Sequence, residues 1–175
     1  MTDWKHILAA LAPHGNPAIL AGMAASMESC IARADLSTSL RQAHFLAQCA
    51  EESDGFHTTL EYASGAAYEG RHDLGNTHPG DGRRYRGRGV IQLTGRANYH
   101  DYGALLGVDL ENHPEVAQTF PFAALIAAEF WKHRSINVPA DANDVVAVTK
   151  KINGGTNGLE DRKIWLARAR HALGM

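Results

Sequence analysis

Residues 122–133, FAALIAAEFWKH, are apolar on nearly every side of a helix. A helix at the surface of a globular domain keeps a polar face, whereas a helix that is apolar all round is buried. The segment therefore predicts a central buried helix against which the other elements pack. We expect its middle, Leu125 to Trp131, to supply much of the stability of the domain.

Further helical segments lie on both sides of this one. Pro17 stands near the first turn of one segment, Ser37 or Thr38 is placed to cap another, and Asn153-Gly154-Gly155 separates the last two. The predicted helices cover residues 3–12, 16–33, about 37–53, 95–106, 141–152 and 159–173. The expected fold is mainly α.

Residues 64–90 have a different composition. The window holds seven glycines together with Pro79, which argues against a long helix. We expect a glycine-rich loop here, or a small irregular sheet with a short hairpin. A long loop inside a compact domain is usually functional or disordered, and the aromatic and arginine side chains in this one favour function.

The composition predicts one globular domain over residues 1–175. Hydrophobic residues make up 45% and charged residues 21%, which excludes a disordered chain, and a net charge of −2 gives no basic field for nucleic acid. Cys30 and Cys49 lack C-x-x-C spacing, so we interpret them as reduced core residues. No signal peptide or apolar stretch long enough for membrane insertion is recognised, which predicts synthesis in the cytoplasm.

Two neighbouring carboxylates end the helix predicted up to residue 53. Glu51 and Glu52 follow an apolar face and precede the Asp54-Gly55 turn. Glycoside hydrolysis needs two carboxyl groups across a cleft, one of them protonated, and burial favours the protonated form. Periodicity does not choose between the two, and a glutamate pair at a helix end is more often a solvated terminus. Glu61 and Glu69 are the candidates for the second carboxylate, and Asp73 and Asp81 are weaker ones.

Three segments carry a family resemblance. Residues 85–99, YRGRGVIQLTGRANY, closely resemble the central signature of glycoside hydrolase family 19, which contains chitinases and many phage endolysins. Residues 45–56, FLAQCAEESDGF, are similar to the helix that bears the catalytic acid in that family. Residues 152–155 followed by Asp161-Arg162 are similar to its C-terminal glycan-binding segment. The matches occur in family order over about residues 40–170.

The resemblance implies roles for the carboxylates. It places Glu52 on the general acid, although Glu51 stands where many members have His and Asp54 where many have Gly. A charged Glu51 would raise the pKa of Glu52 by repulsion. Glu61 resembles the general base of the shorter endolysin members, and Glu69 remains the alternative base.

The resemblance also implies residues that hold water and sugar. Thr94 is expected to hold the attacking water and Tyr99 to line the cleft. The substrate-binding residues implied by the resemblance are Gln92, Asn98, Tyr99, Asn153 and Arg162, the last two binding sugar or orienting the base. Amides and hydroxyls suit sugar hydroxyls. The alternative for Thr94 and Asn98 is a helix cap, and Arg86, Arg88 and Arg96 are expected to be structural ion-pair partners.

The fold implied by the resemblance is lysozyme-like, with two helical lobes and a cleft between them. The family inverts configuration, which requires carboxyl groups roughly 6.5–9.5 Å apart. No cofactor is expected. No H-E-x-x-H motif is present and His72 and His78 have no paired ligands at standard spacing, so we expect no metal.

The substrate implied by this branch is bacterial peptidoglycan. The chain resembles a phage or prophage endolysin, a lysozyme-like N-acetylmuramidase that is made in the cytoplasm and reaches the periplasmic cell wall through a holin-type pore. We expect a monomer that binds glycan strands and neither nucleic acid nor membrane. The alternatives are a chitinase acting on chitin oligomers and a non-hydrolytic glycan-binding module of the same fold. An amidase has no support, since no Cys/His pair or zinc ligand set is present.

Overall fold

The computed structural model describes residues 2–175, and this part of the chain is mainly α-helical. The elements are α1 (Trp4–Leu11), α2 (Pro17–Ala34), α3 (Ser39–Glu52), α4 (Asp81–Arg84), α5 (Arg96–Leu106), α6 (Phe122–His133), α7 (Asn137–Asp141), α8 (Val145–Asn153) and α9 (Leu159–Ala172). Short 3₁₀ turns occupy Ala66–Tyr68, His72–Leu74 and Pro114–Gln118. The mainly α prediction is confirmed.

Side-chain caps start four of the helices where the sequence changes from polar to periodic apolar. Asp3, Asn16, Thr38 and Asp144 each accept a hydrogen bond from a backbone N–H in the first turn of the helix that follows. Of the two residues proposed to cap α3, the structure uses Thr38, whose hydroxyl accepts from the Arg41 amide.

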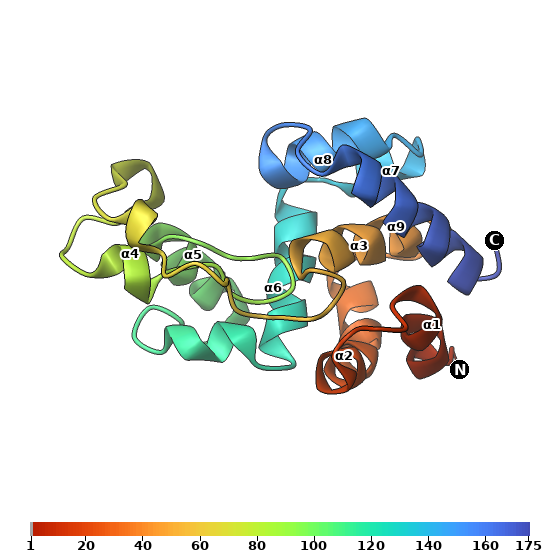
Figure 1. The fold of residues 1–175 in the computed structure, drawn as a ribbon, viewed down its shortest axis with the longest axis horizontal. Helices are drawn as coiled ribbons and strands as arrows, with labels where there is room; N and C mark the ends of the chain where they lie inside the picture. The colour runs from red at the N-terminus through yellow and green to blue at the C-terminus, as the bar shows by residue number, and fades with distance from the viewer. Residues whose placement is uncertain (1) are drawn as a thin grey trace.

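Helix α6 lies in the middle of the molecule, between a lobe that contains α4 and α5 and a lobe that contains α1–α3 and α7–α9 (Figure 1). Seven of its twelve residues are buried, which confirms the central helix expected from its apolar sequence. Helix α2 packs on α6, and α3 packs on α9. The rings of Phe45 on α3 and Trp131 on α6 meet edge to face at 5.5 Å, which joins the helices at the centre of the core.

The glycine-rich insert folds without a sheet. Isolated bridges, Leu60 with Arg88 and Arg88 with Leu93, are the β pairing found within residues 2–175, so the short hairpin allowed by the sequence does not form. Side chains take backbone amides that a ladder would otherwise use: Glu69 accepts from Gly80 and Gly82, and Asp81 accepts from Thr77 and His78.

An ion-pair network fastens the insert to α5. Arg96, the first residue of α5, bonds Asp81 at 2.6 Å and Glu111 at 2.8 Å, and its guanidinium lies 4.9 Å from the centre of the Tyr85 ring. The Arg96 guanidinium lowers the pKa of the buried Asp81 carboxyl to about 2. Arg96 is thus a structural ion-pair partner, as expected, whereas Arg88 donates to the Arg84 carbonyl and the Tyr99 hydroxyl.

The region between α6 and α8 differs from the prediction. A short helix, α7, occupies Asn137–Asp141, and α8 begins at Val145 rather than at residue 141. The Asn137 side chain accepts from the Trp131 indole and donates to the Ala34 carbonyl, while Pro139 and Ala140 are buried. Tertiary contacts therefore determine this turn of helix, which has no periodic signal of its own.

Other predictions concern the cysteines, membranes and metals. Cys30 and Cys49 are both buried and unpaired, as expected for core thiols. No helix among residues 2–175 combines the length and apolar character that crossing a bilayer requires. The same residues contain no group of three or more His, Cys, Asp or Glu side chains placed to hold a metal ion.

Candidate active site

Glu52 is the last residue of α3 and is held by a buried arginine. Arg162 on α9 donates to the Glu52 Oε1 at 2.5 Å and to the Oε1 of Gln48, one turn earlier on α3, also at 2.5 Å. The Glu52 side chain is 19% exposed and the Arg162 side chain 5%. The Glu52 carboxylate is therefore partly exposed, and it is bonded on its buried side to the guanidinium of Arg162.

Arg162 does not play the role expected from the sequence. Its Nε donates to the Asn157 carbonyl at 3.2 Å, so each guanidinium nitrogen bonds a protein group, and the residue is buried. It is therefore a bonded partner of Glu52, the proposed acid, and its burial leaves it unexposed for contact with a sugar. Only the packing of α9 against α3 brings these residues together.

Glu51 has different surroundings from its neighbour. Its carboxylate lies against Gly158 at the start of α9, where a methyl group added to the glycine would clash with the Glu51 Oε1. Partial burial raises the pKa of Glu51, and the charges of Asp161 and Glu52 raise it further, whereas Arg162 acts in the opposite direction. Because Gly158 also has φ +68°, only glycine suits this position.

Glu61 lies in the stretch after α3 and is bound to the signature loop. Its Oε2 accepts from the Gly87 amide at 2.8 Å, and its Oε1 accepts from the Tyr68 hydroxyl at 2.9 Å. Gln92 approaches the same glycine, because a methyl group at Gly87 would lie 2.7 Å from the Gln92 Oε1 and 3.2 Å from the Glu61 Oε2. Gly87 thus lets a carboxylate and an amide come together at one edge of the loop.

Glu69 is placed differently from Glu61. Both of its oxygens accept from backbone amides, those of Gly80 at 2.6 Å and Gly82 at 2.9 Å. It closes a turn of the insert, and neither of its two hydrogen-bond partners is a candidate site residue. The geometry therefore favours Glu61 over Glu69 as the second carboxylate.

Thr94, Gln92 and Asn98 form a short hydrogen-bonded series after that loop. The Thr94 hydroxyl donates to the Gln92 carbonyl at 2.9 Å, and the Asn98 amide donates to the Thr94 carbonyl at 2.7 Å. All three side chains are partly exposed. Helix α5 has Gly95 at its N-cap with no side-chain cap, so the Thr94 hydroxyl does not cap it. The Thr94 oxygen and the Asn98 carbonyl oxygen keep their acceptor capacity for water or sugar.

Tyr99 and Asn153 depart from the expected roles to different degrees. Tyr99 is fully buried beneath the loop, where its hydroxyl donates to the Arg86 carbonyl and accepts from Arg88, so its ring does not line the cleft. Asn153 is exposed at the end of α8, and its side chain bonds the Gly155 amide and the Asn157 carbonyl. It shapes the turn into α9, and its exposed amide keeps one N–H and one acceptor lone pair for a ligand.

Two residues that hold the candidate site, Gln48 and Tyr68, were not predicted from the sequence. Gln48 is fully buried and holds Arg162, and Tyr68 holds Glu61. A polar side chain on the apolar stretch of α3 could have pointed to Gln48. Tyr68 stands among other aromatic residues of the insert, and nothing in its spacing distinguishes it.

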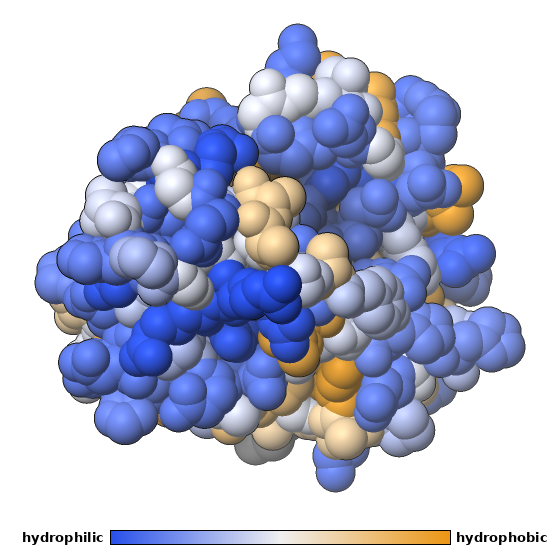
Figure 2. Space-filling view, turned by 60° about the vertical axis from the view of Figure 1, so that its left-hand side comes forward, coloured by the Kyte–Doolittle hydropathy of each residue, from blue (hydrophilic) through white to orange (hydrophobic). Residues whose placement is uncertain are grey.

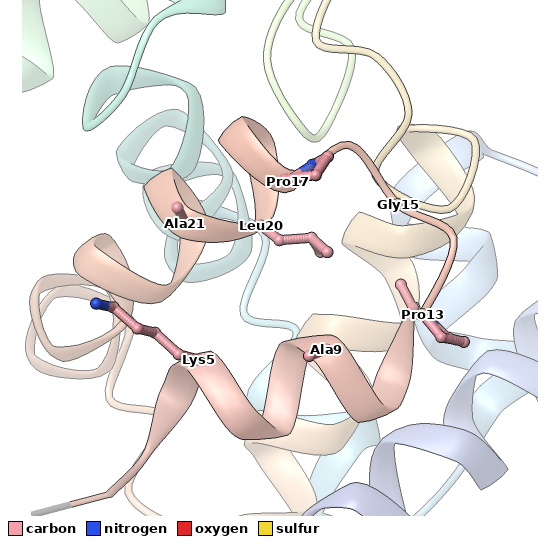
Figure 3. A pocket seen from close by; sticks show the side chains of 8 residues that line it. Lys5, Ala9, Pro13, Gly15, Pro17, Leu20 and Ala21 are labelled. Carbon is pink, nitrogen blue, oxygen red and sulfur yellow. The ribbon is translucent and has the colours of Figure 1, made fainter.

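The surface is hollowed between the lobe that contains α4 and α5, which faces the viewer, and the part of the molecule at the upper right (Figure 2). A hollow of about 520 Å³ lies between α5 and the end of α6, and Asn98, Tyr102 and Arg134 line it. A second hollow of about 530 Å³ lies between α1 and α2, where Leu20 and Lys5 extend from the two helices (Figure 3). The second hollow contains none of the candidate site residues.

Comparison with known sequences places the chain in a family. Residues 18–155 match the family described as Chitinase class I. A glycosyl hydrolase family 19 domain-containing protein of Haemophilus influenzae is 32% identical over 86% of this chain and 86% of its own length. An endochitinase of Arabidopsis thaliana is 32% identical over 65% of this chain, a match that covers 39% of the plant protein.

Solved structures share the fold. Chitinase C from Streptomyces griseus superimposes with a TM-score of 0.74 at 22% identity, covering 100% of this chain and 79% of that one. A class IV chitinase from Zea mays gives a TM-score of 0.69 at 20% identity, covering 100% of this chain and 93% of that one. With the sequence matches, this shows that the chain belongs to glycoside hydrolase family 19 and is a glycoside hydrolase.

Proposed function

We propose that the protein hydrolyses the β-1,4 bonds of peptidoglycan, as an N-acetylmuramidase of the endolysin kind, with Glu52 as general acid and Glu61 as general base. One observation carries this proposal. Glu52 ends the buried helix α3 and is bonded to Arg162, and Glu61 lies in the stretch after α3, bound to the signature loop. Two carboxylates on different elements are what glycoside hydrolysis requires.

Arg162 supports the acid step. When Glu52 transfers its proton to the glycosidic oxygen, the leaving group departs as a neutral alcohol and Glu52 becomes negative. The guanidinium at 2.5 Å is already oriented toward the carboxylate that develops. Electrostatic stabilisation of this kind acts most strongly when the charged group is fixed before the reaction. Gln48 contributes by holding Arg162 in place.

Thr94 and Glu61 suit the water step. The Thr94 proton is already donated to the Gln92 carbonyl, so its oxygen offers only lone pairs. A water that donates one proton to Thr94 and the other to Glu61 directs its own lone pair at the anomeric carbon. Glu61 takes up the water proton as the new C–O bond forms. This single displacement inverts the configuration at that carbon.

The choice of peptidoglycan over chitin rests on charge. The two polymers share the same backbone chemistry, and the relatives compared above include proteins named as endochitinases. Peptidoglycan carries carboxylates beside its glycan strand, whereas chitin carries none. Arg134 lines the same hollow as Asn98 and offers a cation to such a substrate.

Digestion of purified Gram-negative peptidoglycan tests the proposal. Mass spectrometry of the products should show fragments with N-acetylmuramic acid at the reducing end, and proton NMR should show the inverted anomer first. Glu52→Gln should lower the rate by about 10²–10⁴-fold and keep the far-UV circular dichroism of the parent. Cleavage of chitin oligomers with peptidoglycan left intact would reject the substrate, and an active Glu52→Gln variant would reject the acid.

A further inference from the structure

Four exposed cations belong to the C-terminal ends of α6 and α8, a region in which the two helices approach one another (Figure 1). Lys132 and Arg134 belong to the end of α6, and Lys150 and Lys151 to the last turn of α8. Arg134 donates to the Lys151 carbonyl at 3.1 Å, and the Lys151 ammonium donates to the Arg134 carbonyl at 2.9 Å. We call these four residues the basic patch.

The basic patch has no internal counter-charge. Within residues 2–175, no carboxylate lies within 4.0 Å of any of its four cations. Basic side chains at a helix C-terminus stabilise the terminal carbonyls, and the bonds of Arg134 and Lys151 fulfil that role. Lys132 and Lys150 make no such bonds in the described structure. Four positive charges without a paired carboxylate at two neighbouring helix ends favour an external anion.

Arg134 connects the basic patch to the candidate site. Its guanidinium packs 4.3 Å from the centre of the Phe130 ring and lines the hollow of about 520 Å³ that Asn98 also lines. A guanidinium held on an aromatic ring is preorganised for paired hydrogen bonds to a carboxylate. Asp101 is the acidic residue lining this hollow, and it suits an amine carried by the same ligand.

We infer that the basic patch binds the carboxylates of the peptide stems of peptidoglycan while the signature residues hold the glycan strand. The inference rests on the proposed function and adds the part of the substrate that the enzyme recognises outside the sugar backbone. Stem peptides branch from the strand, so their carboxylates lie beside a strand that is bound at Asn98. The stems carry more carboxylates than amines. This charge balance is complementary to the four cations of the basic patch and the single carboxylate, Asp101, that lines the hollow.

The test compares intact peptidoglycan with the same glycan strands after an amidase has removed the stems. The variant combines Lys132→Gln, Arg134→Gln and Lys150→Gln and leaves the Lys151 bond between the helices intact. We expect the KM for intact peptidoglycan to rise about 10-fold and the KM for stripped strands, which keep only the lactyl carboxylate, to rise much less. Added salt should raise the parent KM more on the intact substrate than on the stripped strands.

Controls separate this inference from loss of fold and from the proposed function. A double variant, Lys132→Gln with Lys150→Gln, keeps the bond from Arg134 to the Lys151 carbonyl and so tests charge without disturbing the contact between the helices. A second double variant, Lys5→Gln with Lys163→Gln, removes two exposed cations outside the basic patch. Equal KM changes on both substrates, or no change, would overturn the inference. The inference would also be overturned if the triple variant lost binding to phosphatidylglycerol vesicles while its KM on intact peptidoglycan stayed unchanged. A parent that cuts neither peptidoglycan preparation but cuts chitin rejects the proposed function instead.

Discussion

Glu61 and Glu69 show how hydrogen-bond partners separate two residues that spacing leaves equivalent. Glu61 is bound beside Gln92 at Gly87, whereas both oxygens of Glu69 close a turn of the insert. We expect Glu61→Gln to lower kcat by about 10²–10⁴-fold. Glu69→Gln should lower Tm and keep most of kcat. The reverse result in parallel kinetic and thermal measurements would make Glu69 the base.

Glu51 is a second residue whose surroundings predict a pH effect. Burial raises the pKa of Glu51, so the folded state binds the proton of this carboxyl more tightly than the unfolded chain does. Its effect is absent at low pH, and it destabilises the fold as pH rises above the unfolded pKa of about 4.3. Glu51→Gln should therefore raise Tm at pH 7 and leave it unchanged near pH 3.

The control for Glu51 is a glutamate of the same charge on the surface. Glu160→Gln on α9 removes the charge of an 81% exposed side chain, so the Tm difference between this variant and the parent should depend weakly on pH. Thermal melts of the parent and both variants between pH 3 and pH 7 provide the comparison. A Glu51→Gln variant with a lower Tm at pH 7 would show that attraction to Arg162 outweighs burial.

At the scale of the elements, polar bonds rather than a sheet hold the insert. Asp81 starts α4 and Arg96 starts α5, so their ion pair ties the insert to the next helix. Because Arg96 lowers the Asp81 pKa to about 2, the pair stabilises the fold above about pH 4 and loses this contribution as pH falls toward 2.

Asp81→Asn tests the contribution of that pair. We expect it to lower the free energy of unfolding by about 2 kcal/mol at pH 7, measured by urea denaturation, with the difference from the parent narrowing below pH 4. Asp73→Asn is the matched control, because Asp73 bonds Arg71 at an exposed position in the same insert. A loss for Asp81→Asn that stays constant from pH 7 to pH 3 would assign its effect to shape rather than charge.

At the scale of the whole molecule, α6 joins the two lobes through its buried face. Trp131 is 1% exposed and contacts Phe45 on α3, while its indole donates to Asn137 on α7. Trp131→Ala should lower the free energy of unfolding by about 3–5 kcal/mol, since it opens a cavity and leaves Asn137 without a donor. Trp165→Ala, at a partly exposed position on α9, should cost less in the same urea titration.

Local sequence determined most helices and the family. Residues 122–133 are apolar all round, so their burial in α6 follows from composition, and Thr38 and Asp144 start α3 and α8 through short-range caps. The signature at residues 85–99 fills the loop before α5 and the first turn of that helix. These features depend on neighbours within a few residues, which a sequence displays directly.

Tertiary structure decided which side chains meet. Only the packing of α9 on α3 brings Arg162 to Glu52 and Gln48, more than one hundred residues away in the chain. Burial of Tyr99, the two amides that occupy Glu69, and the meeting of Arg134 with Lys151 likewise depend on long-range contacts. Spacing along the chain shows neither burial nor partners across elements, so the sequence could name the carboxylates but not the groups that hold them.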